Sequence, residues 1–441
     1  MKFSSYNLLV PNSHDNNHYL FNTLNGNCVE IDANTSNAIR RNDISQLSND
    51  VQDLFIKLGI LIQDFVDEHK IISYFHDQGK FASNFFSSTV LLTWACNLKC
   101  VYCFENTGEH ITNMNIEQAN RYIQFVINAA KEKNVKTVSI CLFGGEPLVN
   151  FEIGEYILDK VKTYCDNNGV CFVCSIITNG TLINENIIDR LIKYSCYSIQ
   201  ITLDGVKQVH DSRRMKKNGD GSFDEIISAL KLLNSRYKEI RTVIRINIDK
   251  SNKDDTHQLL NYIGKEGLDL TNCHIDFGIV RGLANACAAY SSHCLMEDEI
   301  GPALFELWNY AEAQGFKYNI RPLRKWMYCG LYGDNQFTIT PDCDVYKCWE
   351  HTGQKEHLMG TLDSDGNMRN IQYAFYDWMA HDPLKNEECK KCIYLPCCGG
   401  GCAVASYHQN KTYHSTGCFK VKGVIEKQVL KYVESIEKSL G

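Results

Sequence analysis

The sequence predicts an α/β protein built around a partial (βα)6 barrel of the TIM-like type. Between residues 88 and 285, apolar runs long enough for buried strands alternate with stretches of helical periodicity. The runs are residues 90–94, 137–142, 171–177, 197–203, 242–248 and 274–280. This alternation is typical of a parallel sheet covered by helices, and six units are fewer than the eight of a closed barrel. Functional residues are therefore expected at the C-terminal ends of these strands.

Smaller units are predicted on both sides of this barrel, which we expect to span residues 86–285. Residues 1–85 have a winged-helix-like pattern, with short strands at 6–10, 18–23 and 28–31 followed by a helical segment. Asn25 and Gly26 supply the turn between the second and third of these strands, because both residues tolerate positive φ. Linker or bridging helices are expected at 286–325.

The last unit, residues 326–441, is rich in cysteine. A hairpin is predicted from two short strands, 337–340 and 345–348, that flank Pro341 and Asp342. Residues 421–440 have the periodicity of a closing helix.

Composition restricts the function. The net charge of −7 gives no basic field for nucleic acid, and no run of about 18 apolar residues is present to span a membrane. The N-terminal residues lack the pattern of a secretion signal, so a cytoplasmic location is expected. In a reducing compartment, a long chain with 21 cysteines more often uses them for metal or iron–sulfur ligation than for disulfides.

A cysteine triplet directly follows the first barrel strand. Cys96, Cys100 and Cys103 are separated by three and two residues. Three thiolates can hold three corners of a four-iron cluster and leave the fourth iron open to a small molecule. A zinc site is the alternative interpretation, but zinc sites favour two Cys-x2-Cys pairs, and no fourth ligand lies nearby in the sequence.

The triplet, with Tyr102 before its last cysteine, resembles the signature of the radical S-adenosylmethionine (SAM) superfamily. Gly144-Gly145-Glu146-Pro147 after the second strand is similar to that family's GGEP motif, and segments after the third and fourth strands also match. The resemblance covers residues 88–285 and implies a [4Fe–4S] cluster and bound SAM. The SAM contacts it implies are Gly144, Gly145, Glu146, Pro147, Thr178, Asn179 and Thr202, with Arg214 and Arg245 as candidates for the SAM carboxylate. Each arginine alone is equally compatible with a surface charge or a structural ion pair.

The C-terminal cysteines resemble the SPASM domain of peptide and protein maturases, which holds two auxiliary four-iron clusters. By this resemblance, Cys389, Cys392, Cys398 and Cys418 hold an outer cluster, and Cys329, Cys348 and Cys402 hold an inner one. Cys397 is interpreted as a bystander. With the barrel site, the resemblance implies three [4Fe–4S] clusters.

Two positions depart from the family pattern. Cys343 stands in the hairpin turn where the family usually has Gly, and it is kept as a candidate extra ligand. Trp349 follows Cys348, where sulfatase-maturing members usually have Asp as a general base. That difference weakens the hypothesis of sulfatase maturation.

The function that these resemblances imply is a radical SAM peptide maturase. A 5′-deoxyadenosyl radical would abstract hydrogen from a ribosomally made peptide to install a thioether or carbon–carbon crosslink. No protein side chain is assigned to the abstraction itself. Residues 19–26 and the helices after them resemble a leader-recognition element, so a precursor peptide with a leader is the expected partner. A reducing donor such as flavodoxin or ferredoxin is also expected.

Other functions remain open at this stage: an anaerobic sulfatase-maturing enzyme, a radical SAM enzyme acting on a small molecule, or a noncatalytic zinc or iron–sulfur protein.

Overall fold

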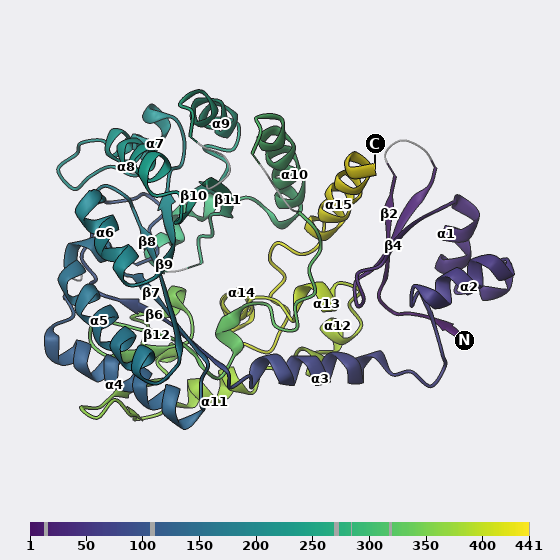
Figure 1. Ribbon diagram of the computed structural model, residues 1–441. Coiled ribbons are helices and arrows are strands. Elements are labelled where there is room, and N and C mark those ends of the chain that lie inside the picture. Colours follow the sequence, from purple (N-terminus) through teal and green to yellow (C-terminus); the bar gives the residue numbers. More distant parts are fainter. Residues whose placement is uncertain (13–15, 106–110, 269–272, 284, 317–319, 441) are drawn as a thin grey trace.

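The computed structural model describes residues 1–12, 16–105, 111–268, 273–283, 285–316 and 320–440. Within these residues one sheet dominates, with the strand order β11-β10-β9-β8-β7-β6-β12-β13-β14-β15 (Figure 1). Its barrel strands are parallel, which confirms the predicted α/β fold. They are β6 (Phe85–Leu91), β7 (Thr137–Phe143), β8 (Cys171–Thr178), β9 (Cys196–Thr202), β10 (Arg241–Ile248) and β11 (Cys273–Ile279).

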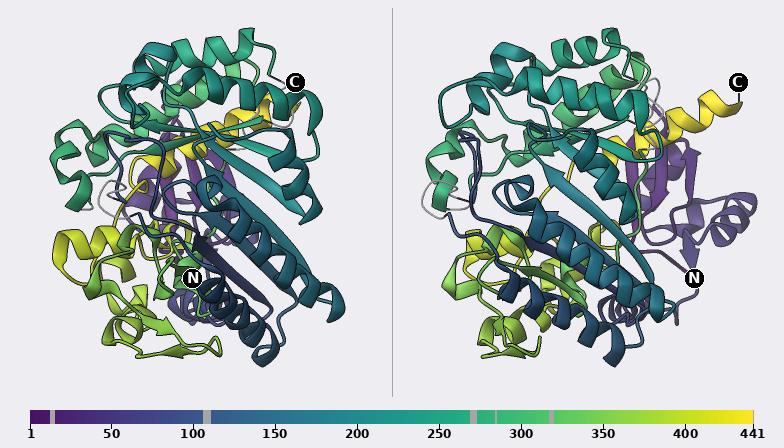
Figure 2. Two further views of the ribbon diagram at one scale, coloured as in Figure 1. Left: turned by 90° about the vertical axis from the view of Figure 1, so that its left-hand side faces the viewer. Right: turned by 60° about the vertical axis from the view of Figure 1, so that its left-hand side comes forward.

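Helices cover the outer face of the barrel strands (Figure 2). In β7, Val138, Ile140 and Leu142 are fully buried and share one apolar core with Ile157 and Val161 of α5. This two-residue periodicity leaves the inner face to the intervening, partly exposed residues, so the barrel interior stays accessible. The helices are α4 (Ile116–Glu132), α5 (Phe151–Asn167), α6 (Glu185–Lys193), α7 (Lys207–Arg213), α8 (Phe223–Arg236) and α9 (Thr256–Lys265).

The Cys-rich segment begins as a continuation of the barrel sheet. β12 (Gln336–Ile339) pairs in parallel with β6. β13 (Asp344–Tyr346) returns antiparallel to β12, as the hairpin prediction requires, and β14 (Gly360–Leu362) and β15 (Met368–Arg369) follow. The barrel and the cysteine-rich unit are therefore joined by backbone hydrogen bonds.

The N-terminal unit has a small antiparallel sheet in the order β2-β3-β4, followed by helices. Its turn between β3 and β4 contains Gly26 at φ +82°. Side-chain caps begin the first two helices, because Asp32 accepts from the Thr35 amide and Ser48 from the Val51 amide. The elements are β1 (Lys2–Phe3), β2 (Asn7–Pro11), β3 (His18–Asn22), β4 (Cys28–Ile31), α1 (Ala33–Arg40), α2 (Asn49–Lys57), β5 (Leu61–Ile62) and α3 (Glu68–Lys80).

This N-terminal unit packs against the C-terminal residues (Figure 1). Leu8, Val10 and Phe21 share an apolar cluster with Val429 of the last helix. Thr23 Oγ1 also donates to the carbonyl of Ile393 at 2.6 Å. The first and last segments of the chain are thus in direct contact.

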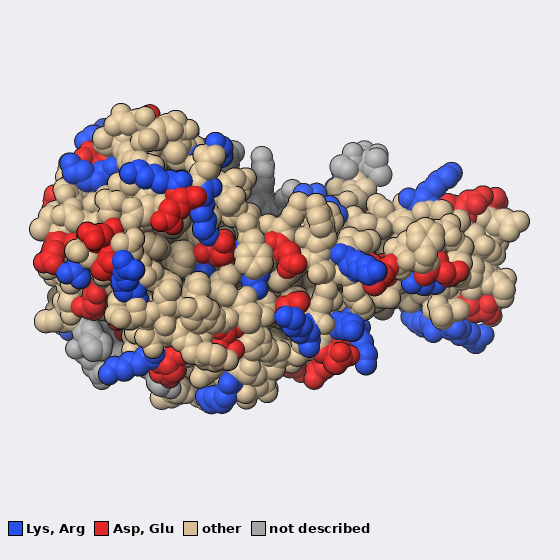
Figure 3. Space-filling view, turned by 90° about the horizontal axis from the view of Figure 1, so that it is seen from below, with Lys and Arg blue, Asp and Glu red and all other residues tan. Residues whose placement is uncertain are grey.

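The remaining helices are α10 (Glu297–Ala313), α11 (Tyr373–Met379), α12 (Glu387–Lys390), α13 (Leu395–Cys398), α14 (Ala403–Asn410) and α15 (Val424–Leu440). α10 packs against α15, where the buried Lys431 donates to Asn309 at 2.8 Å and to Glu312 at 2.5 Å. In the part of the chain that is described, no helix has both the length and the apolar character needed to cross a membrane. On the face in Figure 3, basic and acidic side chains are interspersed.

Two elements differ from the sequence predictions. The first barrel strand ends at Leu91, whereas residues 90–94 were the predicted run, because Thr93 and Ala95 instead bond to the loop after β7. α7 was not expected as a helix. It is short and polar, so hydrophobic periodicity gives little signal there.

Candidate functional site

A cavity of about 390 Å³ opens at the C-terminal ends of the barrel strands. Most residues that the sequence predicted for the barrel site line it: Cys96, Cys100, Cys103, Gly144, Gly145, Thr178, Asn179, Thr202, Arg214 and Arg245. Glu146 and Pro147 do not line it but are buried next to it. Motifs that are far apart in the sequence therefore meet at one cavity.

The loop that carries the cysteines is fixed by backbone pairing at its start. Gly145 N donates to Thr93 O and Glu146 N to Ala95 O, both at 2.9 Å. Gly144 has φ +134°, and a Cβ on Gly145 would overlap the carbonyl of Ala95. Two glycines are needed here because any side chain would separate the loops.

Glu146 connects this loop to the next strand. Its fully buried carboxylate accepts from Thr178 Oγ1 and from the Asn179 amide, both at 2.7 Å, and from the Leu148 amide at 3.0 Å. Burial raises the pKa of Glu146, while these hydrogen bonds oppose the rise. Because both carboxylate oxygens bond to the protein, Glu146 organises the wall of the cavity.

Three cysteine side chains face this cavity. Burial raises the pKa of Cys96 to about 12 and that of Cys100 to about 11. Among the described residues, no group of three His, Cys, Asp or Glu side chains converges as a site for a single metal ion. A four-iron cluster has a different requirement, since each cysteine binds a different iron. Three thiols on one loop, beside a cavity, fit such a cluster with one iron open.

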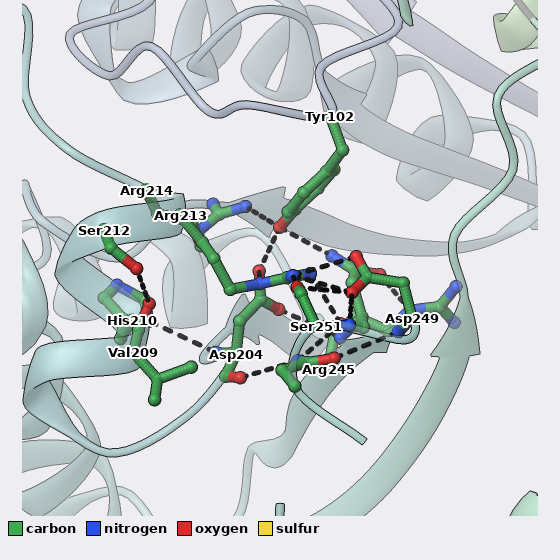
Figure 4. A network of polar contacts seen from close by, with 12 residues as sticks. Tyr102, Asp204, Val209, His210, Ser212, Arg213, Arg214, Arg245, Asp249 and Ser251 are labelled. Carbon is green, nitrogen blue, oxygen red and sulfur yellow. Dashed lines mark hydrogen bonds and ion pairs between the residues drawn. The ribbon is translucent and has the colours of Figure 1, made fainter. Parts of the chain in front are cut away.

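Tyr102 holds the other end of the cysteine loop (Figure 4). Its hydroxyl donates to the fully buried Asp204 and accepts from Arg214 Nη1 at 2.7 Å and from Asn247 Nδ2 at 3.1 Å. The hydroxyl therefore joins the cysteine loop to the ends of β9 and β10. Burial raises the pKa of Tyr102 well above its usual value, so the hydroxyl keeps its proton.

A buried ion pair lies next to the Tyr102 ring. Arg213 Nη1 donates to both oxygens of Asp249 at 3.0 and 2.8 Å, and its guanidinium lies 5.1 Å from the Tyr102 ring (Figure 4). Both charged residues are buried, so each requires the other. The segments that resembled the family at 202–205 and 210–214 supply most of this network.

Arg214 and Arg245 both present guanidinium groups to the cavity. Arg245 is held by Asn247 at 3.1 Å and by Asp276, and its backbone is paired with that of Thr202. Within the part of the chain that the structure describes, Arg214 Nε is buried without a hydrogen-bond partner. Two cations and a hydroxyl on one wall are suited to hold a carboxylate.

Other cavity residues were not predicted from sequence. Glu105 lines the cavity with a buried oxygen that has no hydrogen-bond partner among the described residues, and burial, with a smaller effect of Glu146, raises its pKa to about 8. Trp349 approaches from the C-terminal unit and lies beside Phe143, with ring centres 6.4 Å apart. No sequence pattern indicates Glu105, because its neighbours in space come from other strands.

The cysteines assigned to the inner cluster lie close enough to influence one another. Burial raises the pKa of Cys348 well above its usual value, and the charges of Glu350, Cys402 and Cys329 raise it further. Arg281 Nη1 donates to Cys402 Sγ at 3.3 Å, and its guanidinium also pairs with Glu350. Both interactions link Arg281, which lies two residues after β11, to the C-terminal unit.

The cysteines assigned to the outer cluster form a separate group. Burial raises the pKa of Cys389 and of Cys398 to about 12. The charges of Cys418 and Cys392 add to the rise at both of them. The same four residues that the resemblance groups together are thus neighbours in space.

Cys343 and Cys397 lie outside both groups. Cys343 has φ +66°, and its buried thiol contacts the Gln118 carbonyl of α4 at 3.5 Å. Burial raises the pKa of Cys343, and the charges that also shift this pKa belong to Arg, Asp and Glu side chains and not to another cysteine. Cys397 Sγ donates to the Thr23 carbonyl at 3.5 Å, in the contact with the N-terminal unit. The structure therefore does not place Cys343 with the inner group.

Comparison with known proteins adds to this geometry. Residues 90–263 match the family model of the radical SAM superfamily. The chain is 26% identical to a cysteine-type anaerobic sulfatase-maturating enzyme of Clostridium novyi, over 76% of this chain and 93% of that protein. It is 24% identical to the radical SAM cyclopropyl synthase TigE of Paramaledivibacter caminithermalis, over 96% and 94%. Its fold is similar to that of Streptococcus suis SuiB bound to the precursor peptide SuiA, with a TM-score of 0.56, 15% identity, and 95% and 98% coverage.

We predict that Arg245→Gln weakens SAM binding. Loss of a charge-assisted hydrogen bond of about 1.5–3 kcal/mol should raise the dissociation constant roughly tenfold to a hundredfold. Equilibrium dialysis measures this constant. Arg241→Gln is the matched control, because Arg241 is an exposed arginine at the opposite end of the same strand. Equal affinities in the two variants would contradict the assignment.

We predict that Cys343→Gly leaves the iron content unchanged, whereas Cys348→Ala lowers it by about four irons per chain. Glycine adopts the positive φ of position 343 without strain, so this variant should fold. Iron and sulfide analysis of anaerobically purified protein measures the difference. An equal loss of iron in both variants would make Cys343 a ligand.

Proposed function

We propose that this chain, whose residues 90–263 match the radical SAM family model, is a peptide maturase that installs a thioether or carbon–carbon crosslink in a ribosomally made precursor. The main support is the cavity in which the cysteine triplet, two arginines and Thr202 meet. A structural neighbour bound to a precursor peptide supports the substrate class, and a relative that matches nearly the whole chain supports radical SAM chemistry.

In this proposal, Cys96, Cys100 and Cys103 hold a [4Fe–4S] cluster. Together with SAM, such a cluster would supply radical chemistry that abstracts hydrogen from an unactivated carbon. Arg214 and Arg245 bind the SAM carboxylate by charge-assisted hydrogen bonds.

The two other cysteine groups would hold auxiliary clusters, giving three in all. Cys329, Cys348 and Cys402 hold the inner one, which leaves one of its irons without a cysteine. Trp349, next to Cys348, lines the cavity and would position the peptide there. Arg281 keeps the Cys402 thiolate oriented and partly neutralised.

Peptide delivery is assigned to the N-terminal unit. β2 packs on α15, so β4 is the edge of the small sheet that remains available. Its outward N–H and C=O groups can pair with an extended leader strand. Tethering the leader would raise the concentration of the core peptide at the cavity. A flavodoxin or ferredoxin would supply electrons in the cytoplasm.

Sulfatase maturation is the second candidate, because the Clostridium novyi relative has that function. Trp349 follows Cys348 where such enzymes usually have Asp, and this difference favours the crosslinking function. Formylglycine in a sulfatase-derived peptide after incubation with the enzyme would establish the second candidate instead.

We predict that anaerobic enzyme carries about twelve irons and, with a strong reductant, converts SAM into 5′-deoxyadenosine and methionine. Replacing Cys96, Cys100 and Cys103 together by Ala should remove about a third of the iron and all cleavage. Cys141→Ala is the control, since Cys141 lies in strand β7, outside the triplet. Chromatography of the products and metal analysis test this. Stoichiometric zinc, or S-adenosylhomocysteine as sole product, would refute it.

We predict that Glu30→Pro lowers modification of the full-length precursor peptide by at least tenfold while SAM cleavage without peptide stays unchanged. The Asn22 amide bonds to the Asn27 carbonyl, so by alternation Glu30 presents its backbone to the open edge of β4. Proline removes that donor. Glu30→Ala is the matched control, because it loses the same side chain and keeps the N–H. Normal modification by a folded Glu30→Pro enzyme would exclude this edge as the leader site.

A further inference from the structure

Two adjoining cavities lie between the N-terminal unit, the segment before the cysteine-rich sheet and α15. Their volumes are about 220 and 230 Å³, and both are lined by Arg321 and Leu323. We call them together the basic groove. Its N-terminal wall is uncharged and consists of Phe21, Asn25 and Gly26.

The groove is lined by cations. Arg321, Arg324 and Lys325 are exposed, and Lys420 is fixed by a hydrogen bond of 3.1 Å to the Phe277 carbonyl. Among the residues that the structure describes, no Asp or Glu lines these two cavities. The groove is therefore positively charged, although the whole chain carries a net charge of −7.

The floor of the groove belongs to the outer cysteine group. Cys398 lines the second cavity, and the Lys325 amide donates to the Pro396 carbonyl at 2.7 Å. The basic segment is therefore held directly against the turn that carries a proposed cluster ligand.

From this juxtaposition we infer that the basic groove is the docking site of an acidic one-electron carrier protein. The inference rests on the proposed outer cluster at Cys398. One electron would leave the reduced carrier and enter the oxidised outer cluster, with no bond made or broken. Electron-transfer complexes are small and are steered by opposite charge, which suits a shallow cationic groove.

An acidic leader peptide is the competing occupant. Three of the four cations belong to residues 321–325 and the fourth is Lys420, while the N-terminal unit contributes no charge to the groove. A leader paired with β4 would not require these cations. Because the segment that carries three of the cations is bonded to the outer cysteine turn at Pro396, the charges favour a partner of that cysteine group.

The test uses holoenzyme and a purified acidic two-cluster ferredoxin. We expect Arg321→Glu with Lys325→Glu to lower the second-order rate of cluster reduction, followed by stopped-flow absorbance, at least tenfold at low salt. The affinity for oxidised ferredoxin, measured by calorimetry, should fall in parallel. At high salt the difference should disappear, because exposed charges are screened.

Arg41→Glu with Lys57→Glu is the matched control, since both residues are exposed and lie at the ends of α1 and α2. Photoreduced deazariboflavin, an uncharged reductant, should reduce all variants equally. Unchanged rates and affinity in the groove variant would overturn the inference, as would loss of precursor affinity in that variant without loss of ferredoxin affinity. Absence of clusters from the wild-type enzyme would instead refute the proposed function.

Discussion

The backbone contact between the loops after β6 and β7 determines the geometry of the barrel site. Gly144 and Gly145 allow the second loop to lie against Thr93 and Ala95, immediately before the first cysteine. Any larger residue would displace the carbonyl of Ala95 and with it the start of the cysteine loop. Buried Glu146 extends the same constraint to the end of β8. The strand ends are thus fixed relative to one another before a cofactor binds.

Tyr102 completes this constraint from the opposite end of the loop. Its hydroxyl lies among Asp204, Arg214 and Asn247, which come from segments more than 100 positions away in the sequence. Buried charges of this kind are costly unless each has a partner. The cysteine loop is therefore held at Ala95 and at Tyr102, with Cys96 and Cys100 between these points and Cys103 directly after the second.

The sequence was sufficient for the strands of the barrel, because a sheet covered by helices produces long apolar runs at regular intervals. It was also sufficient to predict that most of the barrel-site residues lie together, since parallel strands end at one edge of the sheet. It could not show that β6 ends at Leu91 or that Glu105 faces the cavity. These features depend on which loop lies against which, and no local pattern records that. Cys343, which stands where the family pattern has Gly, illustrates the same limit, because only the structure shows that its thiol lies against α4.

The contact between the N-terminal unit and the last helix has a consequence for how the protein is made. Leu8, Val10 and Phe21 leave the ribosome about 400 residues before Val429, on which they pack, is synthesised. Until then these side chains have no partner surface, and the chain must complete the barrel with them exposed. Such intermediates are prone to aggregation, so we expect chaperones to bind this unit during synthesis. Filling of the outer cysteine group would likewise come after synthesis of the barrel, because its members Cys398 and Cys418 follow the barrel in the chain.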